Sequence, residues 1–293
     1  MTTAGVIGLG DIGRGVADAL LRAGIDLVVC DVRPEATAPF AGTAEVAPSP
    51  AALGARCDVV LVAVVNDAQV RAVVEGPDGA LSSMDGGAVV VLATVAPATV
   101  EALGQAAAPR GVDVLDCAVS GGPEASAAGA LVAMVGGDEA AVERARPVLD
   151  AFTSLVVPMG PLGAGLKAKL ARNLVQYGSW LAAHEAQVLA EAAGIELSKL
   201  ALVIRESDKF IGGAARLMFR DTTAPLPVGT DPGYVAAMAA GASLAHKDLR
   251  AALELGRALG VDMPLAAMTD ARCDEVFAIT LHPEALRTSK DAP

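Results

Sequence analysis

The stretch Gly8-Leu9-Gly10-Asp11-Ile12-Gly13 carries three glycines at the spacing GxGxxG and follows a short apolar segment at the start of the chain. An amphipathic helical pattern continues over 12–23, and a second apolar segment, 27–31, ends in an acid 18 residues after Gly13. Glycines at this spacing let the backbone and a helix N-terminus approach a pyrophosphate, and the acid can accept hydrogen bonds from a ribose. In this context the stretch predicts a dinucleotide-binding βαβ unit, in preference to a glycine-rich turn followed by a surface acid.

Two residues at the end of the second apolar segment bear on the choice of cofactor. Asp31 repels a ribose 2′-phosphate, which favours NAD, whereas Arg33 is placed to receive that phosphate, so NADP stays possible. The alternative for Arg33 is an ordinary solvated loop charge. The residues that we expect to contact the cofactor here are Gly8, Leu9, Gly10, Asp11, Ile12, Gly13, Asp31, Val32 and Arg33.

Short β-branched runs alternate with alanine-rich helical patterns through the first half of the chain. The apolar runs are nearly continuous, which is typical of strands covered on both faces, as in a parallel sheet. The expected strands are 5–8, 27–31, 59–65, 88–93, 112–116, 131–135 and 154–157, and the expected helices are 12–23, 67–74, 97–108 and 139–152. This order predicts an α/β fold with an N-terminal, Rossmann-type doubly wound sheet.

Prolines and glycines at 158–163 end this alternation, and no convincing strand follows them. We therefore predict a dinucleotide-binding domain over 1–160 and an all-helical domain for substrate binding and oligomerisation over 161–293. The expected helical features are a long helix over 166–193 that ends at Gly194, a helix capped by Ser198, a helix over 234–259 and a last helix opened by Pro264. The long helix is apolar around most of its circumference, which predicts a homodimer or homotetramer.

The composition excludes several classes of function. The 293 residues carry a net charge of −12 and only eight aromatic side chains, which argues against binding to nucleic acid or to an anionic membrane. No uncharged run is long enough to span a bilayer, and the N-terminus lacks a signal-peptide pattern, so we expect a cytoplasmic protein. Four cysteines without CxxC spacing are expected to be reduced and mostly buried, and three histidines without ligand spacing predict no metal site.

Polar residues in three later segments are candidates for the reacting end of the site. Lys169 and Asn173 are four residues apart and share one face of the long helix, whereas Lys167 points elsewhere. Ser120-Gly121-Gly122 follows a strand and offers a hydroxyl and close-approach N–H groups to a carboxylate. Each segment also has an ordinary interpretation: a lysine that reaches solvent, a strand-to-loop turn and, for Lys247-Asp248, a solvated charge pair.

Four motifs in order resemble the β-hydroxyacid dehydrogenase family, the 3-hydroxyisobutyrate dehydrogenase-like branch of the 6-phosphogluconate dehydrogenase superfamily. They are GLGDIG near the start, DCAVSGGPEASAAGALVAMVGG, GAGLKAKLARNL and the late KDL, and together they extend over nearly the whole chain. The resemblance implies hydride transfer between a nicotinamide cofactor and a small 3-hydroxy acid, 3-hydroxyisobutyrate-like, or the matching semialdehyde. It implies that Lys169 is catalytic and that Asn173 positions the substrate.

The same resemblance assigns the other candidate residues. Ser120, Gly121 and Gly122 would hold the substrate carboxylate. The residues that would contact the cofactor, beyond the glycine-rich turn, are Val64, Val65, Asn66, Thr94 and, near the nicotinamide end, Lys247.

The chain departs from the family pattern at Arg172, Ala125-Ser126, Ala93 and Ala240, most of which shape the pocket. The alternatives are an imine reductase of the same architecture and a non-catalytic dinucleotide-binding scaffold. Proteins of both kinds commonly lack the catalytic lysine, so Lys169 counts against them.

Overall fold

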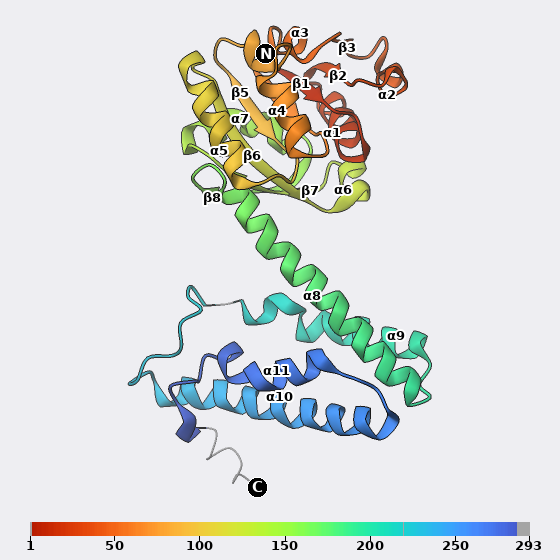
Figure 1. Cartoon of the computed structure of the whole chain (residues 1–293), viewed down its shortest axis with the longest axis vertical. Coiled ribbons are helices and arrows are strands. Elements are labelled where there is room, and N and C mark those ends of the chain that lie inside the picture. The colour runs from red at the N-terminus through yellow and green to blue at the C-terminus, as the bar shows by residue number, and fades with distance from the viewer. Residues whose placement is uncertain (1, 219, 286–293) are drawn as a thin grey trace. The chain divides into compact units, whose positions relative to one another are not determined.

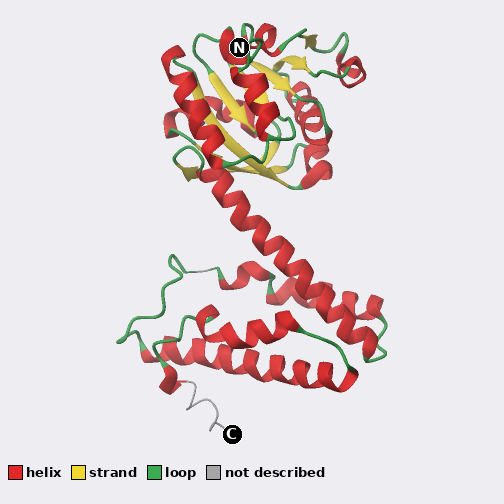
Figure 2. Ribbon diagram, viewed as in Figure 1, coloured by secondary structure: helices red, strands yellow, loops and turns green. Residues whose placement is uncertain are grey.

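The computed structural model describes residues 2–218 and 220–285. By its internal contacts the chain divides into two compact units, Met1–Asn173 and Leu174–Pro293. This division falls within helix α8 (Ala164–Ala192), and the domain boundary at residue 160 stays a prediction. The first unit contains all the strands among the described residues, and the second contains only helices and loops (Figures 1 and 2).

An eight-stranded sheet in the order β3-β2-β1-β4-β5-β6-β7-β8 forms the centre of the first unit. The strands are β1 (Thr3–Ile7), β2 (Asp26–Cys30), β3 (Glu45–Val46), β4 (Val59–Val62), β5 (Ala88–Val91), β6 (Asp113–Ser120), β7 (Leu131–Gly136) and β8 (Thr153–Gly160). The order reverses direction between β1 and β4, which is the arrangement of a doubly wound sheet. The predicted fold class is confirmed.

The last two strands, β7 and β8, run opposite to the other six, which differs from the prediction of a parallel sheet. Strand β7 runs antiparallel to β6, while every other neighbouring pair is parallel. Only ten residues separate Ser120, where β6 ends, from Leu131, where β7 begins. A parallel crossover needs about a dozen residues or more, so the chain returns beside β6 in the opposite direction.

Apolar side chains fill both faces of the sheet and explain why its strands read as continuous hydrophobic runs. The helices of this unit are α1 (Asp11–Arg22), α2 (Pro34–Thr37), α3 (Pro50–Gly54), α4 (Asp67–Glu75), α5 (Pro97–Ala107), α6 (Gly122–Ala128) and α7 (Glu139–Asp150). Leu20 of α1 and Leu149 of α7 belong to one buried cluster, and Val70 of α4 and Leu103 of α5 belong to the other. Neighbouring strand residues alternate between the clusters, as Val28 and Val29 of β2 do, so the two clusters lie on opposite faces of one sheet.

The second unit contains most of α8 together with α9 (Leu197–Ile211), α10 (Pro232–Leu259) and α11 (Pro264–Val276). Val235, Met238 and Ala242 of α10 and Cys273 of α11 share a small buried cluster. The prediction that Ser198 caps α9 was wrong. The cap residue is Glu196, and Ser198 lies in the first turn, where its hydroxyl donates a hydrogen bond to the Glu196 carboxylate.

All four cysteines are buried and unpaired, as predicted. Within residues 2–218 and 220–285, no helix is both long and apolar enough to cross a membrane. The same described residues contain no cluster of three or more histidine, cysteine, aspartate or glutamate side chains arranged to hold a metal ion.

Candidate functional site

The glycine-rich turn connects β1 to α1 at the point where the strand order reverses. Gly8 has a φ of +92°, and its N–H donates to the carbonyl of Cys30 in β2. A side chain at Gly13 would collide with the carbonyl oxygen of Gly8, whereas a Cβ at Gly10 would meet no atom within 4 Å. Gly8 and Gly13 thus tighten the turn, and Gly10 leaves open the space that a pyrophosphate needs. Helix α1 has no side-chain cap at Gly10, so its first N–H groups are available to an anion.

A cavity of about 380 Å³ opens at this turn, at the carboxyl ends of the parallel strands. It is lined by residues that follow β1, β4 and β5, by two residues in and after β6, and by the side of α8 that carries Lys169. Eight of the predicted site residues line it: Gly10, Asp11, Ile12, Val64, Val65, Thr94, Gly122 and Lys169. A dinucleotide fits this lining because the walls are mainly apolar and one end is an uncapped helix N-terminus.

Asp31 lies directly beside the glycine-rich turn, although it does not line the cavity. Its Oδ2 accepts a hydrogen bond of 2.7 Å from the N–H of Leu9, and Arg33 donates to its carboxylate through its backbone N–H and its guanidinium. Partial burial alone would raise the pKa of Asp31, but these hydrogen bonds lower it. Asp31 is therefore a carboxylate held at the turn, while Val32 and the Arg33 side chain are exposed.

Lys169 projects from α8 into the cavity. Its ammonium donates a hydrogen bond of 2.6 Å to the carbonyl oxygen of Val119 in β6. Burial lowers the pKa of Lys169, and the positive charge of Arg172 lowers it further. Lys167, two residues earlier, points elsewhere as predicted: its exposed ammonium lies 3.3 Å from a carboxylate oxygen of Glu101. Of these two lysines, Lys169 alone is placed to exchange a proton with a molecule in the cavity.

The Ser120-Gly121-Gly122 segment makes the turn from β6 into α6. Ser120 is the last residue of β6, and the two glycines have φ angles of +131° and +71°. Helix α6 then packs on α1, where the buried Ser126 hydroxyl donates to the carbonyl of Ile12. Ser126, one of the departures from the family pattern, therefore fixes the segment that follows β6 against the glycine-rich turn.

The other predicted site residues lie apart from the cavity lining. Asn66 caps α4, where its side chain accepts a hydrogen bond from the N–H of Gln69. Asn173 lies one turn beyond Lys169 on α8 and accepts a hydrogen bond of 3.4 Å from Arg172. Lys247 lies in the second unit, on α10, where its exposed ammonium pairs with Asp248. The binding roles predicted for these three residues stay predictions.

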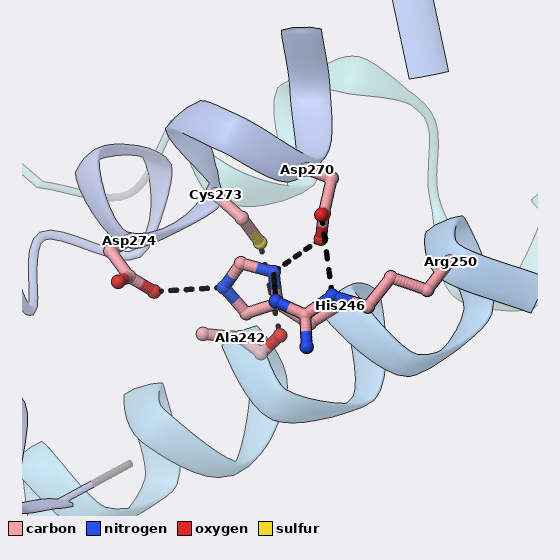
Figure 3. Close-up of polar contacts among 6 residues, drawn as sticks. All are labelled: Ala242, His246, Arg250, Asp270, Cys273 and Asp274. Atoms are coloured by element: carbon pink, nitrogen blue, oxygen red, sulfur yellow. Dashed lines mark hydrogen bonds and ion pairs between the residues drawn. The ribbon is translucent and has the colours of Figure 1, made fainter. Parts of the chain in front are cut away.

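The histidine next to Lys247 belongs to a polar cluster between α10 and α11 (Figure 3). The Nδ1 atom of His246 lies 2.5 Å from Asp270, its Nε2 atom lies 3.0 Å from Asp274, and Arg250 also pairs with Asp270. The hydrogen bond with Asp270 raises the pKa of His246, and the same bond lowers the pKa of Asp270. The cluster joins the two helices beside Lys247 and was not predicted, because a lone histidine gives no pairing signal in the sequence.

Sequence reasoning also missed a buried carboxylate and part of the cavity wall. Asp116 of β6 is completely buried and accepts two backbone hydrogen bonds at the start of α8. The signal for it was an acid in the middle of an apolar strand. Ala63 and Leu92 line the cavity because they follow strands β4 and β5. A hollow of about 600 Å³ at the amino ends of β1 and β2 brings together none of the predicted residues.

Comparison with known proteins places both halves of the chain. Residues 3–160 match the family described as the NAD binding domain of 6-phosphogluconate dehydrogenase. Residues 163–280 match the family described as NAD-binding of NADP-dependent 3-hydroxyisobutyrate dehydrogenase.

Individual relatives agree with these matches. The chain is 43% identical to L-threonate dehydrogenase of Cupriavidus necator over 206 residues, 69% of each chain. It is 31% identical to 2-(hydroxymethyl)glutarate dehydrogenase of Eubacterium barkeri over 90% of this chain and 85% of that one. The solved structure of Mycobacterium tuberculosis 3-hydroxyisobutyrate dehydrogenase with L-serine is 28% identical, with a TM-score of 0.66 over 96% of this chain and 99% of that one. The chain therefore belongs to the 3-hydroxyisobutyrate dehydrogenase-like branch of the β-hydroxyacid dehydrogenases, whose members are nicotinamide-dependent oxidoreductases.

Proposed function

We propose that this protein transfers a hydride between NAD and a small 3-hydroxy acid, 3-hydroxyisobutyrate-like, or the matching semialdehyde. The observation that carries the proposal is the position of Lys169, whose partly buried ammonium lies in the cavity that the glycine-rich turn lines. The relatives named above as dehydrogenases of L-threonate and of 2-(hydroxymethyl)glutarate, both hydroxy acids, support this class of substrate.

The residue types suit the two tasks that the protein itself must perform, which are moving the hydroxyl proton and orienting the substrate and the cofactor. A bound nicotinamide supplies the hydride chemistry. Lys169 takes the hydroxyl proton from the substrate, or returns it in the reverse direction. A free lysine, with a pKa of about 10.4, is a poor base at neutral pH because it is almost fully protonated. The lowered pKa of Lys169 increases the share of its neutral form at a given pH.

The remaining roles concern orientation. In this proposal Ser120, Gly121 and Gly122 hold the substrate carboxylate, and Asn173 orients the substrate without adding charge. Lys247 contacts the cofactor near its nicotinamide end. The glycine-rich turn, together with Asp31, Val64, Val65, Asn66 and Thr94, holds the rest of the cofactor. The four buried, free cysteines support a reducing, cytoplasmic location.

A panel assay tests the function. Purified protein is incubated with NAD and with 3-hydroxyisobutyrate, other 3-hydroxy acids, 2-hydroxy acids and simple alcohols, and formation of reduced cofactor is followed by absorbance. We expect turnover of at least one 3-hydroxy acid. We expect no turnover of the simple alcohols, because they lack a carboxylate. A parallel assay supplies NADH or NADPH and cyclic imines. Oxidation of the reduced cofactor there, without any turnover of hydroxy acids in the panel, would reject the proposal in favour of an imine reductase.

The carboxylate at the glycine-rich turn leads to a prediction about cofactor choice. In this proposal the adenosine ribose binds beside Asp31, so the 2′-phosphate of NADP would meet a like charge there. We expect kcat/KM to favour NAD over NADP by about tenfold or more, which corresponds to about 1.4 kcal/mol. Asp31→Asn keeps an acceptor for the N–H of Leu9 but removes the charge, and it is expected to lower the ratio of kcat/KM with NAD to kcat/KM with NADP. A clear preference of the unaltered protein for NADP would mean that Arg33 dominates this end of the site.

We also propose that the protein is a homodimer or homotetramer, with a second copy covering the apolar side chains of the helical unit. On α8, Leu174, Tyr177 and Leu181 recur at intervals of three and four residues and are all more than half exposed. Trp180 beside them is 60% exposed, and Phe210 of α9 is 88% exposed. A continuous apolar stripe of this kind is unusual on a monomer and suits an isologous helix interface.

Light scattering over a dilution series tests the assembly. We expect a particle of at least twice the chain mass down to micromolar concentration, and Trp180→Glu is expected to shift the particle toward monomer. Lys199→Glu, at an exposed ion pair on α9, serves as a charge control. A monomer at micromolar concentration in the unaltered protein would contradict the proposal.

A further inference from the structure

The carboxylate of Asp116 is completely buried and joins two parts of the chain that are distant in sequence. Its Oδ1 accepts a hydrogen bond of 2.6 Å from the N–H of Gly163, and its Oδ2 accepts one of 2.7 Å from the N–H of Leu166. These are N–H groups at the start of α8, which have no partner within the helix. Asp116 of β6 thus caps the N-terminus of α8, as a residue next to the helix in sequence commonly does. Its negative charge is favourable at a helix N-terminus.

Two glycines make room for this contact. A Cβ at Gly136 of β7 would collide with Oδ1 of Asp116 and would lie 2.8 Å from the backbone nitrogen of Ala164. A Cβ at Gly165 would collide with the carbonyl oxygen of Met134 and would lie 2.9 Å from Oδ2 of Asp116. The start of α8 therefore lies close against β6 and β7, and the Asp116 carboxylate is bound at this contact.

The same strand and the same helix meet again at Lys169. Leu166, whose N–H is bound by Asp116, lies three residues before Lys169 on α8. Val119, whose carbonyl accepts the hydrogen bond from Lys169, lies three residues after Asp116 on β6. Helix and strand are therefore fixed to each other at two points, one formed by the carboxylate and the other by the ammonium itself.

We propose that Asp116 is a positioning residue for Lys169: it anchors the start of α8 on β6 so that the ammonium enters the cofactor cavity beside Val119. Asp116 does not touch the cavity and takes no part in proton transfer. The expected effect on kcat rests on the proposed function, whereas the anchoring of α8 on β6 does not. A displacement of about 1 Å at a reacting group can lower a rate by about 10².

Asp116→Asn tests the proposal, because it keeps the shape of the side chain and removes one acceptor and the charge. We expect kcat to fall by about 10-fold to 100-fold, with the Kd for NAD changed less than threefold. The second readout is independent of catalysis: the rate at which acetic anhydride labels Lys169, followed by mass spectrometry as a function of pH. We expect the labelling curve of Lys169 to move toward that of an exposed lysine, with a higher pKa.

Glu185 supplies a matched control. It is also a buried carboxylate that accepts two backbone hydrogen bonds at a helix start, from Leu265 and Ala266 of α11, at 3.0 and 2.8 Å. Glu185→Gln is expected to lower the Tm as Asp116→Asn does, with the labelling curve of Lys169 unchanged. If Asp116→Asn lowers the Tm but leaves both kcat and the labelling curve unaltered, Asp116 is structural only and the proposal is overturned.

Two further measurements cover the other outcomes. If Asp116→Asn does not fold, hydrogen exchange in the unaltered protein decides: the Leu166 amide is expected to be strongly protected, and fast exchange there overturns the proposal. If no hydroxy acid of the panel is turned over, the proposed function fails, and if Lys169→Ala keeps its activity, the catalytic role of Lys169 fails. In either case a shifted labelling curve in Asp116→Asn would still support the anchoring.

Discussion

Lys169→Ala is expected to lower kcat by about 10² or more, while the affinity for NAD changes less than threefold. The ammonium of Lys169 lines the cavity at the glycine-rich turn, and its pKa is lowered by burial and by Arg172. Loss of a positioned acid or base typically lowers a rate by 10² to 10⁴. Because the lysine bonds to a carbonyl of the protein and not to the glycine-rich turn, cofactor binding is expected to persist.

Lys167→Ala is the control for this change. It removes a lysine from the same turn of α8, but one that pairs with Glu101 at the surface. We expect nearly full activity from it. Steady-state kinetics with the best substrate of the panel give kcat, and calorimetric titration gives the Kd for NAD. Near-normal kcat in Lys169→Ala would remove this residue from the mechanism.

Gly10→Val is expected to weaken NAD binding by about 10² or more without unfolding the protein. A Cβ at Gly10 meets no protein atom within 4 Å, and the φ of −71° and ψ of −169° are open to any residue, so the free protein tolerates a side chain. The valine would occupy the space beside the start of α1 where a pyrophosphate must approach. Calorimetric titration measures the affinity, and addition of NAD should raise the Tm of the unaltered protein but not that of the variant.

Gly213→Val is the matched control. Gly213 has a similar backbone conformation, with φ of −85° and ψ of −157°, and equally open surroundings, but it lies in the helical unit. We expect this variant to bind NAD normally. If Gly10→Val binds NAD within threefold of the unaltered protein, the cofactor does not approach this turn.

Local patterns determined the larger part of the fold in the first unit. The predicted bounds of β1, β2, α1 and α5 agree with the structure to within two residues, because apolar periodicity and glycine spacing act over short stretches of chain. The same patterns placed Asp31 beside the glycine-rich turn, since the residue that follows β2 lies at the same edge of the sheet as the turn that follows β1. Short elements were missed, among them α6, because seven residues carry too little periodicity to detect.

The sequence by itself determined the sheet-and-helix order, the glycine-rich turn and the choice of Lys169 over Lys167 as the candidate base. Only the tertiary structure decided three features. Strand β7 runs antiparallel to β6, the ammonium of Lys169 donates a hydrogen bond to the carbonyl of Val119, and the Asp116 carboxylate caps the start of α8. Each of these depends on groups that meet across long separations in sequence, 50 residues between Val119 and Lys169. Local sequence propensity cannot predict such contacts. The Asp116 carboxylate becomes buried, and binds the two N–H groups at the start of α8, only when the strand and the helix have packed together.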